Sequence, residues 1–352
     1  MPILWQDAMA SALYGPGGFF VADTGPADHF RTSVHASPGF ATALLRLISE
    51  VDSTLGHPDR FDVVDVGAGR GELLRALAGL AVGVSARRSP DEPSLVAARP
   101  SLAERIRFTA VEYADRPENL PEEINWTSEI PAGITGVLLA TEWLDNVPLD
   151  IAVHTEDGWR YALVDPDTGA ESVGEPVSPD DLDWLTNWWP RPETPHNNHS
   201  RAEIGRTRDE AWAQAVGKIS QGLAVAVDYG HLRGTRPVDG TLTGYRGGRQ
   251  VPPVPDGSSD VTAHVAMDSV ASAGAAVARC AYSLVLQREA LRALGADGGR
   301  PPLSLAGTDP VGYVRALAAA SAVAELTDPA GLGGHWWLRQ PVGIPLGPVV
   351  AR

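Results

Sequence analysis

The sequence of 352 residues contains a single cysteine, Cys280, and a single lysine, Lys218. One cysteine excludes an intrachain disulfide and a metal cluster held by several cysteines. No run of about 20 uncharged apolar residues is present, and the N-terminus lacks the pattern of a secretory signal. These absences predict a cytoplasmic protein with no membrane partner.

Basic residues are also scarce, at 28 against 44 acidic residues, which gives a formal net charge of −16. Nonspecific binding to nucleic acid depends on clustered basic side chains, so we expect no nucleic-acid partner. A negative molecule attracts cationic partners over long range. The plainer interpretation of the charge is an acidic surface that keeps the protein soluble.

Four short segments are apolar along their whole length and have strand character: residues 61–66, 107–111, 136–140 and 223–228. Continuous apolar strands are typical of a parallel sheet that is covered on both faces. The hydrophobic residues make up 43% of the chain, which is enough for a sizeable core. The pattern predicts an α/β, doubly wound fold.

A glycine-rich loop follows the first of these strands and contains Asp65, Gly67, Gly69 and Gly71 in the pattern D-x-G-x-G-x-G. A dinucleotide-binding loop has the pattern G-x-G-x-x-G, and here Glu72 occupies the position of the third glycine. This spacing argues against a nicotinamide oxidoreductase and is typical of class I S-adenosylmethionine (SAM) methyltransferases. A tight turn without a ligand is the alternative.

Acidic residues end the next strands. Glu112 follows the second strand, where a carboxylate could accept hydrogen bonds from both ribose hydroxyls of SAM; the alternative is a solvated charge. Glu142 and Asp145 follow the strand at 136–140, near the expected place of methyl transfer. The alternative is an N-cap for a following helix, with Asp145 or Thr141 as the capping residue.

Residues 151–221 interrupt the α/β pattern with an expected hairpin, a stretch rich in Trp, Pro and His, and a helix. We therefore predict three parts. They are an N-terminal helical segment at 1–60, a SAM-binding core at 61–150 and 222–352, and an inserted cap at 151–221.

Ordered motifs along nearly the whole chain resemble those of the MidA-type SAM-dependent methyltransferases. This family includes a mitochondrial complex I assembly factor that methylates a protein arginine. The motifs lie at residues 14–20, 30–33, 65–71, 140–148, 227–231, 240–246, 260–265 and 287–295. Thr141 departs from the family, which usually has Asn there, and residues 34–36 depart from its usual Pro-Glu-Ile.

The resemblance implies a mostly parallel, seven-stranded Rossmann-like sheet with an inserted cap, and SAM as the cofactor. It places Phe30, Thr32 and Ser33 near the cofactor. It further implies a protein substrate with an accessible arginine, and a homodimer is a further expectation.

A guanidinium stays protonated, so carboxylates must hold it in position for transfer. We predict that Glu142 orients it and that Asp145 assists. His231 and His264 are candidates for proton transfer, although structural roles are the favoured interpretation, and no metal site is predicted. A small-molecule O- or N-methyltransferase and a non-catalytic SAM-binding assembly factor stay open as alternatives.

Overall fold

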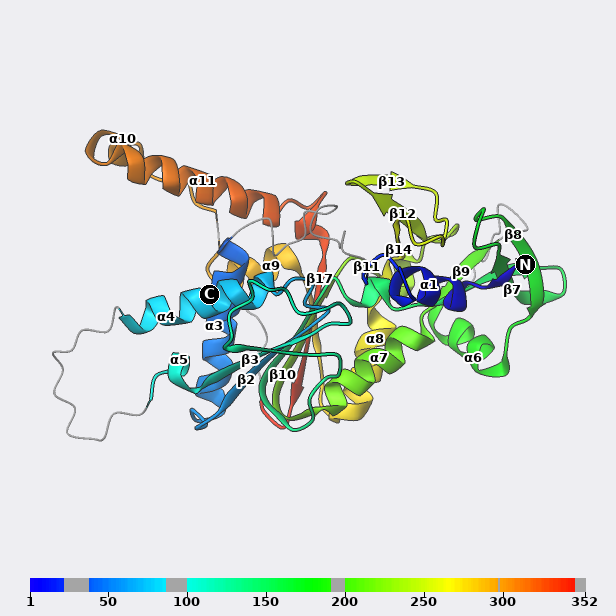
Figure 1. The fold of residues 1–352 in the computed structure, drawn as a ribbon, viewed down its shortest axis with the longest axis horizontal. Helices are drawn as coiled ribbons and strands as arrows, with labels where there is room; N and C mark the ends of the chain where they lie inside the picture. Colours follow the sequence, from blue (N-terminus) through cyan, green and yellow to red (C-terminus); the bar gives the residue numbers. More distant parts are fainter. Residues whose placement is uncertain (22–37, 87–99, 191–199, 297, 346–352) are drawn as a thin grey trace.

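The computed structural model describes residues 1–21, 38–86, 100–190, 200–296 and 298–345. Two sheets dominate the fold and follow one another along the long axis in Figure 1, with the smaller sheet at the end marked N. The larger sheet contains the glycine-rich loop, and the smaller sheet contains most of the predicted cap.

The larger sheet is mixed and follows the order β16–β17–β10–β5–β2–β3–β4. Its strands are β2 (Phe61–Val66), β3 (Ile106–Val111), β4 (Ile124–Thr127), β5 (Ile134–Thr141), β10 (Ile219–Asp228), β16 (Ser283–Leu286) and β17 (Trp336–Val342). The pairs among β10, β5, β2, β3 and β4 are parallel, whereas β17 runs antiparallel to both β10 and β16. Since the chain order reverses between β2 and β5, this is the switch point at which open α/β sheets bind ligands.

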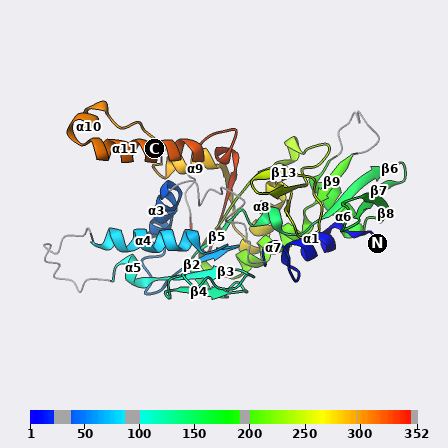
Figure 2. The ribbon, with the colours of Figure 1, turned by 45° about the horizontal axis from the view of Figure 1, so that its top comes forward.

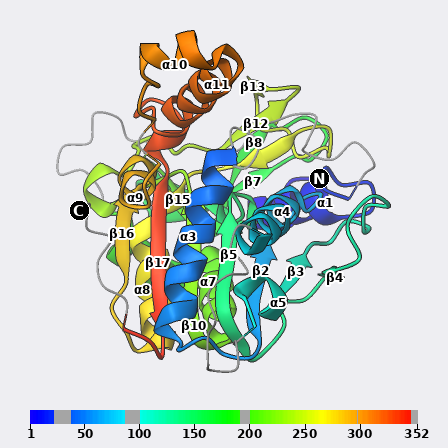
Figure 3. The same ribbon diagram turned by 90° about the vertical axis from the view of Figure 1, so that its left-hand side faces the viewer.

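Helices cover both faces of this sheet, as Figure 3 shows. On one face, α3 (Pro38–Thr54) and α4 (Glu72–Ala86) pack with the sheet in one core. On the other face, α7 (Arg206–Gly217) and α8 (Met267–Ala278) contribute to a second core. The prediction of an α/β fold with helices on both faces is confirmed.

The smaller sheet has the order β1–β7–β6–β9, and β8 pairs with β7. Its strands are β1 (Ile3–Leu4), β6 (Asp150–Thr155), β7 (Gly158–Val164), β8 (Glu171–Pro176) and β9 (Arg201–Ile204). Helix α1 (Trp5–Tyr14) packs against this sheet through Trp5, Met9 and Leu13, and α6 (Pro179–Trp188) packs through Trp184 and Leu185. The hairpin expected in this segment is confirmed as β6 and β7, which pair antiparallel and are joined by residues 156 and 157.

The remaining elements are short or peripheral. They are α5 (Leu102–Arg105), η2 (Leu144–Asn146), β11 (Gly230–His231), η3 (Arg233–Thr235), β12 (Thr243–Arg246), β13 (Arg249–Val251), β14 (Asp260–Thr262), β15 (Val265–Ala266), α9 (Gln287–Ala293), α10 (Leu303–Thr308), α11 (Pro310–Leu326) and η4 (Leu332–Gly334). Helices α10 and α11 form a hairpin that projects from the body of the molecule (Figure 2).

Packing contacts cross the three segments predicted from sequence. Helix α3, from residues 1–60, and α7, from residues 151–221, both pack on the larger sheet because each has an apolar face that the sheet covers. Strand β1 pairs with β7 of the predicted cap. The boundaries themselves stay a prediction.

Candidate active site

The glycine-rich loop leaves β2 at the switch point in a tight turn. Gly67, Gly69 and Gly71 have φ angles of +70°, +58° and +77°, a region that disfavours residues with a Cβ. A Cβ on Gly67 would lie 3.0 Å from Cδ1 of Trp143, and one on Gly71 would lie 2.6 Å from Cδ1 of Leu120. The alternating glycines therefore let the loop pass close to its neighbours and leave its backbone accessible.

Glu112 follows β3, next to this loop, as the sequence predicts. One carboxylate oxygen accepts a hydrogen bond from the Gly69 N–H at 2.9 Å, and the other accepts one from the Tyr113 N–H at 2.7 Å. Burial raises the pKa of Glu112, while these backbone N–H groups favour its charged form. A carboxylate has further lone pairs, so Glu112 could also accept hydrogen bonds from sugar hydroxyls.

Asp65 lies on β2, immediately before the loop, and its side chain is buried. Burial and the nearby negative charges of Glu112 and Glu72 raise the pKa of Asp65 to about 8. The carboxyl group is therefore mostly protonated at neutral pH, and it can donate a hydrogen bond as well as accept one.

Strand β5 ends beside β2, and Glu142 follows it with a φ of +52°, which is rare for a residue other than glycine. Its backbone N–H donates to the Val227 carbonyl at 2.8 Å. This bond holds the residue at the carboxyl end of the sheet. Strained backbone of this kind is typical of functional sites, where the surrounding structure holds it in place.

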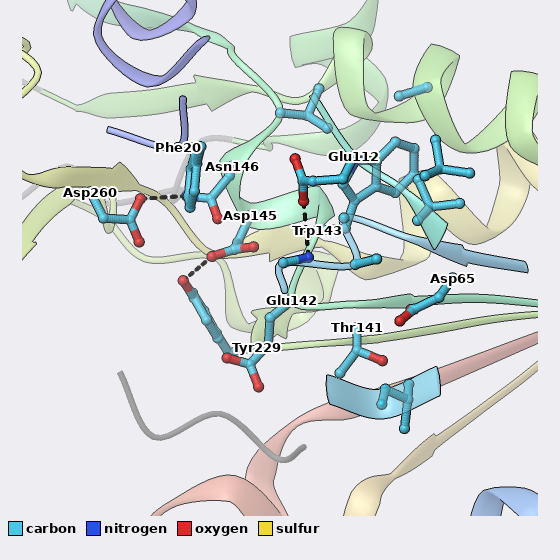
Figure 4. A pocket seen from close by; sticks show the side chains of 18 of the residues that line it. Phe20, Asp65, Glu112, Thr141, Glu142, Trp143, Asp145, Asn146, Tyr229 and Asp260 are labelled. Atoms are coloured by element: carbon cyan, nitrogen blue, oxygen red, sulfur yellow. Dashed lines mark hydrogen bonds between the residues drawn. The ribbon is translucent and has the colours of Figure 1, made fainter. Parts of the chain in front are cut away.

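Asp145 lies on η2 and is only 2% exposed. Its Oδ2 accepts a hydrogen bond from the Tyr229 hydroxyl (Figure 4). It accepts a second from Oγ1 of Thr262 at 2.8 Å. Its Oδ1 is buried and has no hydrogen-bond partner among the described residues. Burial raises the pKa of Asp145, and the two hydroxyl donors oppose that rise.

Two further buried carboxylates, Asp260 and Asp228, surround Asp145. Asp260 accepts a hydrogen bond from the Asn146 side chain at 2.7 Å, and Asp228 accepts from the backbone N–H groups of Leu144 and Asp145 at 3.0 and 3.3 Å. Burial and the charge of Asp145 raise the pKa of both groups well above the ordinary value. A cation bound here would offset the repulsion between these carboxylates and favour their charged forms.

The glycine loop and the acidic residues line one cavity of about 1080 Å³. The predicted site residues that line it are Asp65, Gly67, Gly69, Glu112, Glu142 and Asp145. Gly71 is absent from the lining and packs against Leu120. Phe30, Thr32 and Ser33 lie outside the described residues.

Aromatic residues form another part of the cavity lining. Tyr14 stacks on Phe20 with ring centroids 5.6 Å apart, and it meets Tyr113 edge-on at 5.5 Å. The Tyr14 hydroxyl donates to the Asn146 carbonyl at 3.2 Å. The sequence places Tyr14 and Phe20 in a motif, but only the fold brings them next to the acidic residues.

The two histidine candidates occupy different environments. His231 is buried, with Nδ1 2.8 Å from the Arg236 guanidinium and Nε2 3.9 Å from Glu203. His264 lines the cavity and contacts the Tyr229 ring edge-on at 5.1 Å. Burial lowers the pKa of His264, so its imidazole is neutral at pH 7.

Asp228 and Asp260 were not among the residues predicted to form the site. Asp228 and Asp260 belong to sequence motifs that carry the resemblance, which was the available signal. In the described ranges, we find no group of three side chains arranged to bind a metal ion. Within those ranges, none of the helices has the length and apolar character needed to cross a membrane.

The residues present fit SAM. The glycine backbone is accessible at Gly67 and Gly69, a carboxylate stands at the end of the adjacent strand, and the cavity is large enough for the sugar and amino-acid parts of SAM. Glu112 would hold the ribose, and the loop of Gly67 and Gly69 would lie against the methionine part.

Comparison with protein-family models matches residues 43–284 to the S-adenosyl-L-methionine-dependent methyltransferases. The chain belongs to this family. As a member of a SAM-dependent methyltransferase family, it uses SAM as its cofactor.

Two curated relatives of this methyltransferase are both named protein arginine methyltransferase NDUFAF7, mitochondrial. The Danio rerio protein is 28% identical over 346 residues, which cover 88% of this chain and 76% of the relative. The Xenopus tropicalis protein is 26% identical over 321 residues, which cover 84% and 73%.

Two crystal structures of Burkholderia thailandensis proteins share the fold of this methyltransferase. One, bound to S-adenosylhomocysteine, has a TM-score of 0.73 at 22% identity and covers 98% of this chain and 89% of that chain. The other, a native structure, has a TM-score of 0.72 at 20% identity, with 99% and 89% covered.

Proposed function

We propose that this methyltransferase transfers the methyl group of SAM to a guanidinium nitrogen of a protein arginine. The observation that carries the proposal is Oδ1 of Asp145, a buried carboxylate oxygen without a hydrogen-bond partner among the described residues. Asp145 lines the cavity together with Glu142 and Asp260. A guanidinium offers five N–H donors and a permanent positive charge, which suits this group of acceptors.

The relatives support the same acceptor, since both are named protein arginine methyltransferases. The strand order of the larger sheet supports the finer assignment to the seven-stranded, doubly wound methyltransferase type. A net charge of −16 also favours the approach of a cationic protein.

In this proposal the side chains bind and orient the acceptor. Glu142 holds one edge of the guanidinium, and Asp145, fixed by Tyr229 and Thr262, accepts from another N–H. SAM, when bound, supplies an electrophilic methyl group. The S–C electron pair would stay on sulfur as S-adenosylhomocysteine leaves, and the methylated nitrogen would pass its proton to the Glu142 carboxylate. Holding the reacting atoms in line supplies most of the acceleration.

The test is a transfer assay on the purified full chain with a pair of peptides. One peptide carries a single arginine in a neutral sequence, and the other carries lysine in its place. We expect S-adenosylhomocysteine to accumulate, and the peptide to gain a methyl group, only with the arginine peptide. Transfer to lysine alone, or to neither peptide but to a small hydroxyl or amine compound, would contradict the proposed acceptor.

The proposal also includes a protein partner that presents the arginine, a homodimer and the absence of a nucleic-acid partner. The cytoplasmic location also stays a prediction, and the two curated relatives are named as mitochondrial.

A further inference from the structure

The first turn of α7 contains a buried arginine, Arg208, which is 1% exposed. Its guanidinium donates hydrogen bonds to four backbone carbonyls rather than to a carboxylate. They belong to Asp145 at 2.5 Å, Val147 at 3.2 Å, Ala263 at 2.9 Å and His264 at 3.0 Å. One side chain thus joins two loops that are more than 100 residues apart in the chain.

These two loops carry the acidic end of the cavity. The first contains Asp145, and the second follows Asp260 and Thr262, of which Thr262 donates to the Asp145 carboxylate. The loops also touch directly, since the Ala263 N–H donates to the Asp145 carbonyl at 3.3 Å. The relative placement of Asp145 and Asp260 therefore depends on contacts that Arg208 completes.

The preceding residue of α7 strengthens the link between this helix and the loop of Asp145. The Thr207 hydroxyl donates to the Pro148 carbonyl at 2.6 Å, so two successive residues of α7 hold the loop of Asp145. In contrast, Arg206 on the same turn pairs with Asp181 at 2.8 Å and with Glu210 at 2.6 Å. Arg206 is absent from the cavity lining and serves as a neighbour for comparison.

The charge of Arg208 acts on the same groups. The titratable groups that face Asp145 are Asp228 and Tyr229 from β10, Asp260 from β14, Tyr14 from α1 and Arg208 from α7. Burial raises the pKa of Asp145, and the charge of Arg208 is among the influences that lower it. Of the titratable groups just named, Arg208 is the one that carries a positive charge.

We propose that Arg208 is a positioning residue for methyl transfer: it clamps the two acidic loops so that Asp145 and Asp260 face one guanidinium. Its positive charge lies next to these loops and favours the ionised form of the Asp145 carboxylate. This inference rests on the proposed function, because it assigns the acidic residues to binding a cationic acceptor.

Two variants separate the geometric role of Arg208 from its charge. In Arg208→Lys the charge stays, but a single ammonium with three N–H groups replaces the planar fork that reaches four carbonyls. We expect kcat/KM for the arginine peptide to fall about 10- to 100-fold, and the acidic limb of the pH–rate profile to stay in place. In Arg208→Met the charge is lost too, and that limb should move to higher pH by about one unit or more.

The measurement uses the full chain and three readouts: SAM affinity, peptide affinity in the presence of S-adenosylhomocysteine, and the pH dependence of kcat and KM. SAM affinity should stay within about threefold, since the glycine loop does not touch Arg208. Arg206→Lys is the matched control and should leave both the rate and the pH profile unchanged.

Folded Arg208 variants with the wild-type rate and pH profile would overturn the inference. If both variants fail to fold, Thr262→Val tests it instead, because it removes the hydroxyl donor that connects the second loop to Asp145. A wild-type peptide rate in a folded Thr262→Val protein would also overturn it. Wild-type protein that neither binds nor methylates the arginine peptide would instead reject the proposed function, and this inference with it.

Discussion

Substitution of Glu142 by glutamine tests the proposed acceptor site with the smallest change of shape. Glutamine matches glutamate in size and has the same backbone preferences, so the positive φ at this position costs a similar amount in both proteins. The change removes one negative charge from the cavity and converts one acceptor oxygen into an N–H donor. That donor would face the N–H groups of the guanidinium.

The expected loss follows from two contributions. A hydrogen bond between charged partners contributes about 1.5–3 kcal/mol. The glutamine N–H and the guanidinium N–H that would face each other without an acceptor cost about 1–3 kcal/mol more. Together they amount to about 2.5–6 kcal/mol, which corresponds to a fall of about 10²- to 10⁴-fold in kcat/KM for the arginine peptide. SAM affinity should change little, because the cofactor would contact Glu112 and the glycine loop instead.

The assay measures S-adenosylhomocysteine formation at varied peptide concentration and, separately, SAM binding by calorimetry. Glu129→Gln provides the matched control, because Glu129 also lines the cavity but is not part of the acidic group around Asp145. The control should keep more than about half of the wild-type rate. A Glu142→Gln protein that binds SAM and turns over the peptide at the wild-type rate would refute the assignment.

Two predictions concern stability rather than chemistry. Burial raises the pKa of Asp209 to about 6 from 3.8, so the folded protein holds that proton longer than the unfolded chain as the pH rises. The free energy of unfolding should therefore fall by up to about 3 kcal/mol between pH 4 and pH 7. In Asp209→Asn, urea titrations at the two pH values should no longer show this contribution to the fall. A variant with the pH dependence of the wild type would contradict the prediction. Arg105 bonds Asp52 through two N–H groups at 2.8 and 2.7 Å, and both side chains are buried. Arg105→Met should lower the free energy of unfolding by about 3–5 kcal/mol, because a buried carboxylate loses its partner. SAM affinity of the folded protein should not change, and a variant as stable as the wild type would contradict the reasoning.

Local patterns predicted much of the larger sheet. Strand β2 begins and ends at the predicted residues, and β3, β5 and β10 begin earlier than predicted. Apolar, β-branched runs mark a strand that is buried on both faces, and a following glycine loop fixes where it ends. Helix α3 has a similar local signal, because its apolar residues recur at helical spacing.

The pairing of distant segments could not be predicted in the same way. Strand β1 joins the sheet of the predicted cap, and α7 leaves that cap to pack on the larger sheet. The order of hydrophobic residues shows that such a helix has a buried face, but not which surface covers it.

The acidic site shows the same division between local and distant information. Glu112, Glu142 and Asp145 were predicted because each closely follows a strand of the parallel sheet. Asp260 comes from a short strand in a different sheet, and Arg208 acts through backbone carbonyls that carry no sequence signal. Only the folded chain brings these residues together.

The central claim is that this chain binds SAM at the glycine loop, and calorimetric titration of the purified full chain tests it most directly. We predict micromolar binding of SAM and S-adenosylhomocysteine, and none of NADH. In Gly69→Val that binding should be lost, because a β-branched residue is strained at a φ of +58°. Folded wild-type protein that binds neither SAM nor S-adenosylhomocysteine, or a Gly69→Val variant that binds both as tightly as the wild type, would contradict the account.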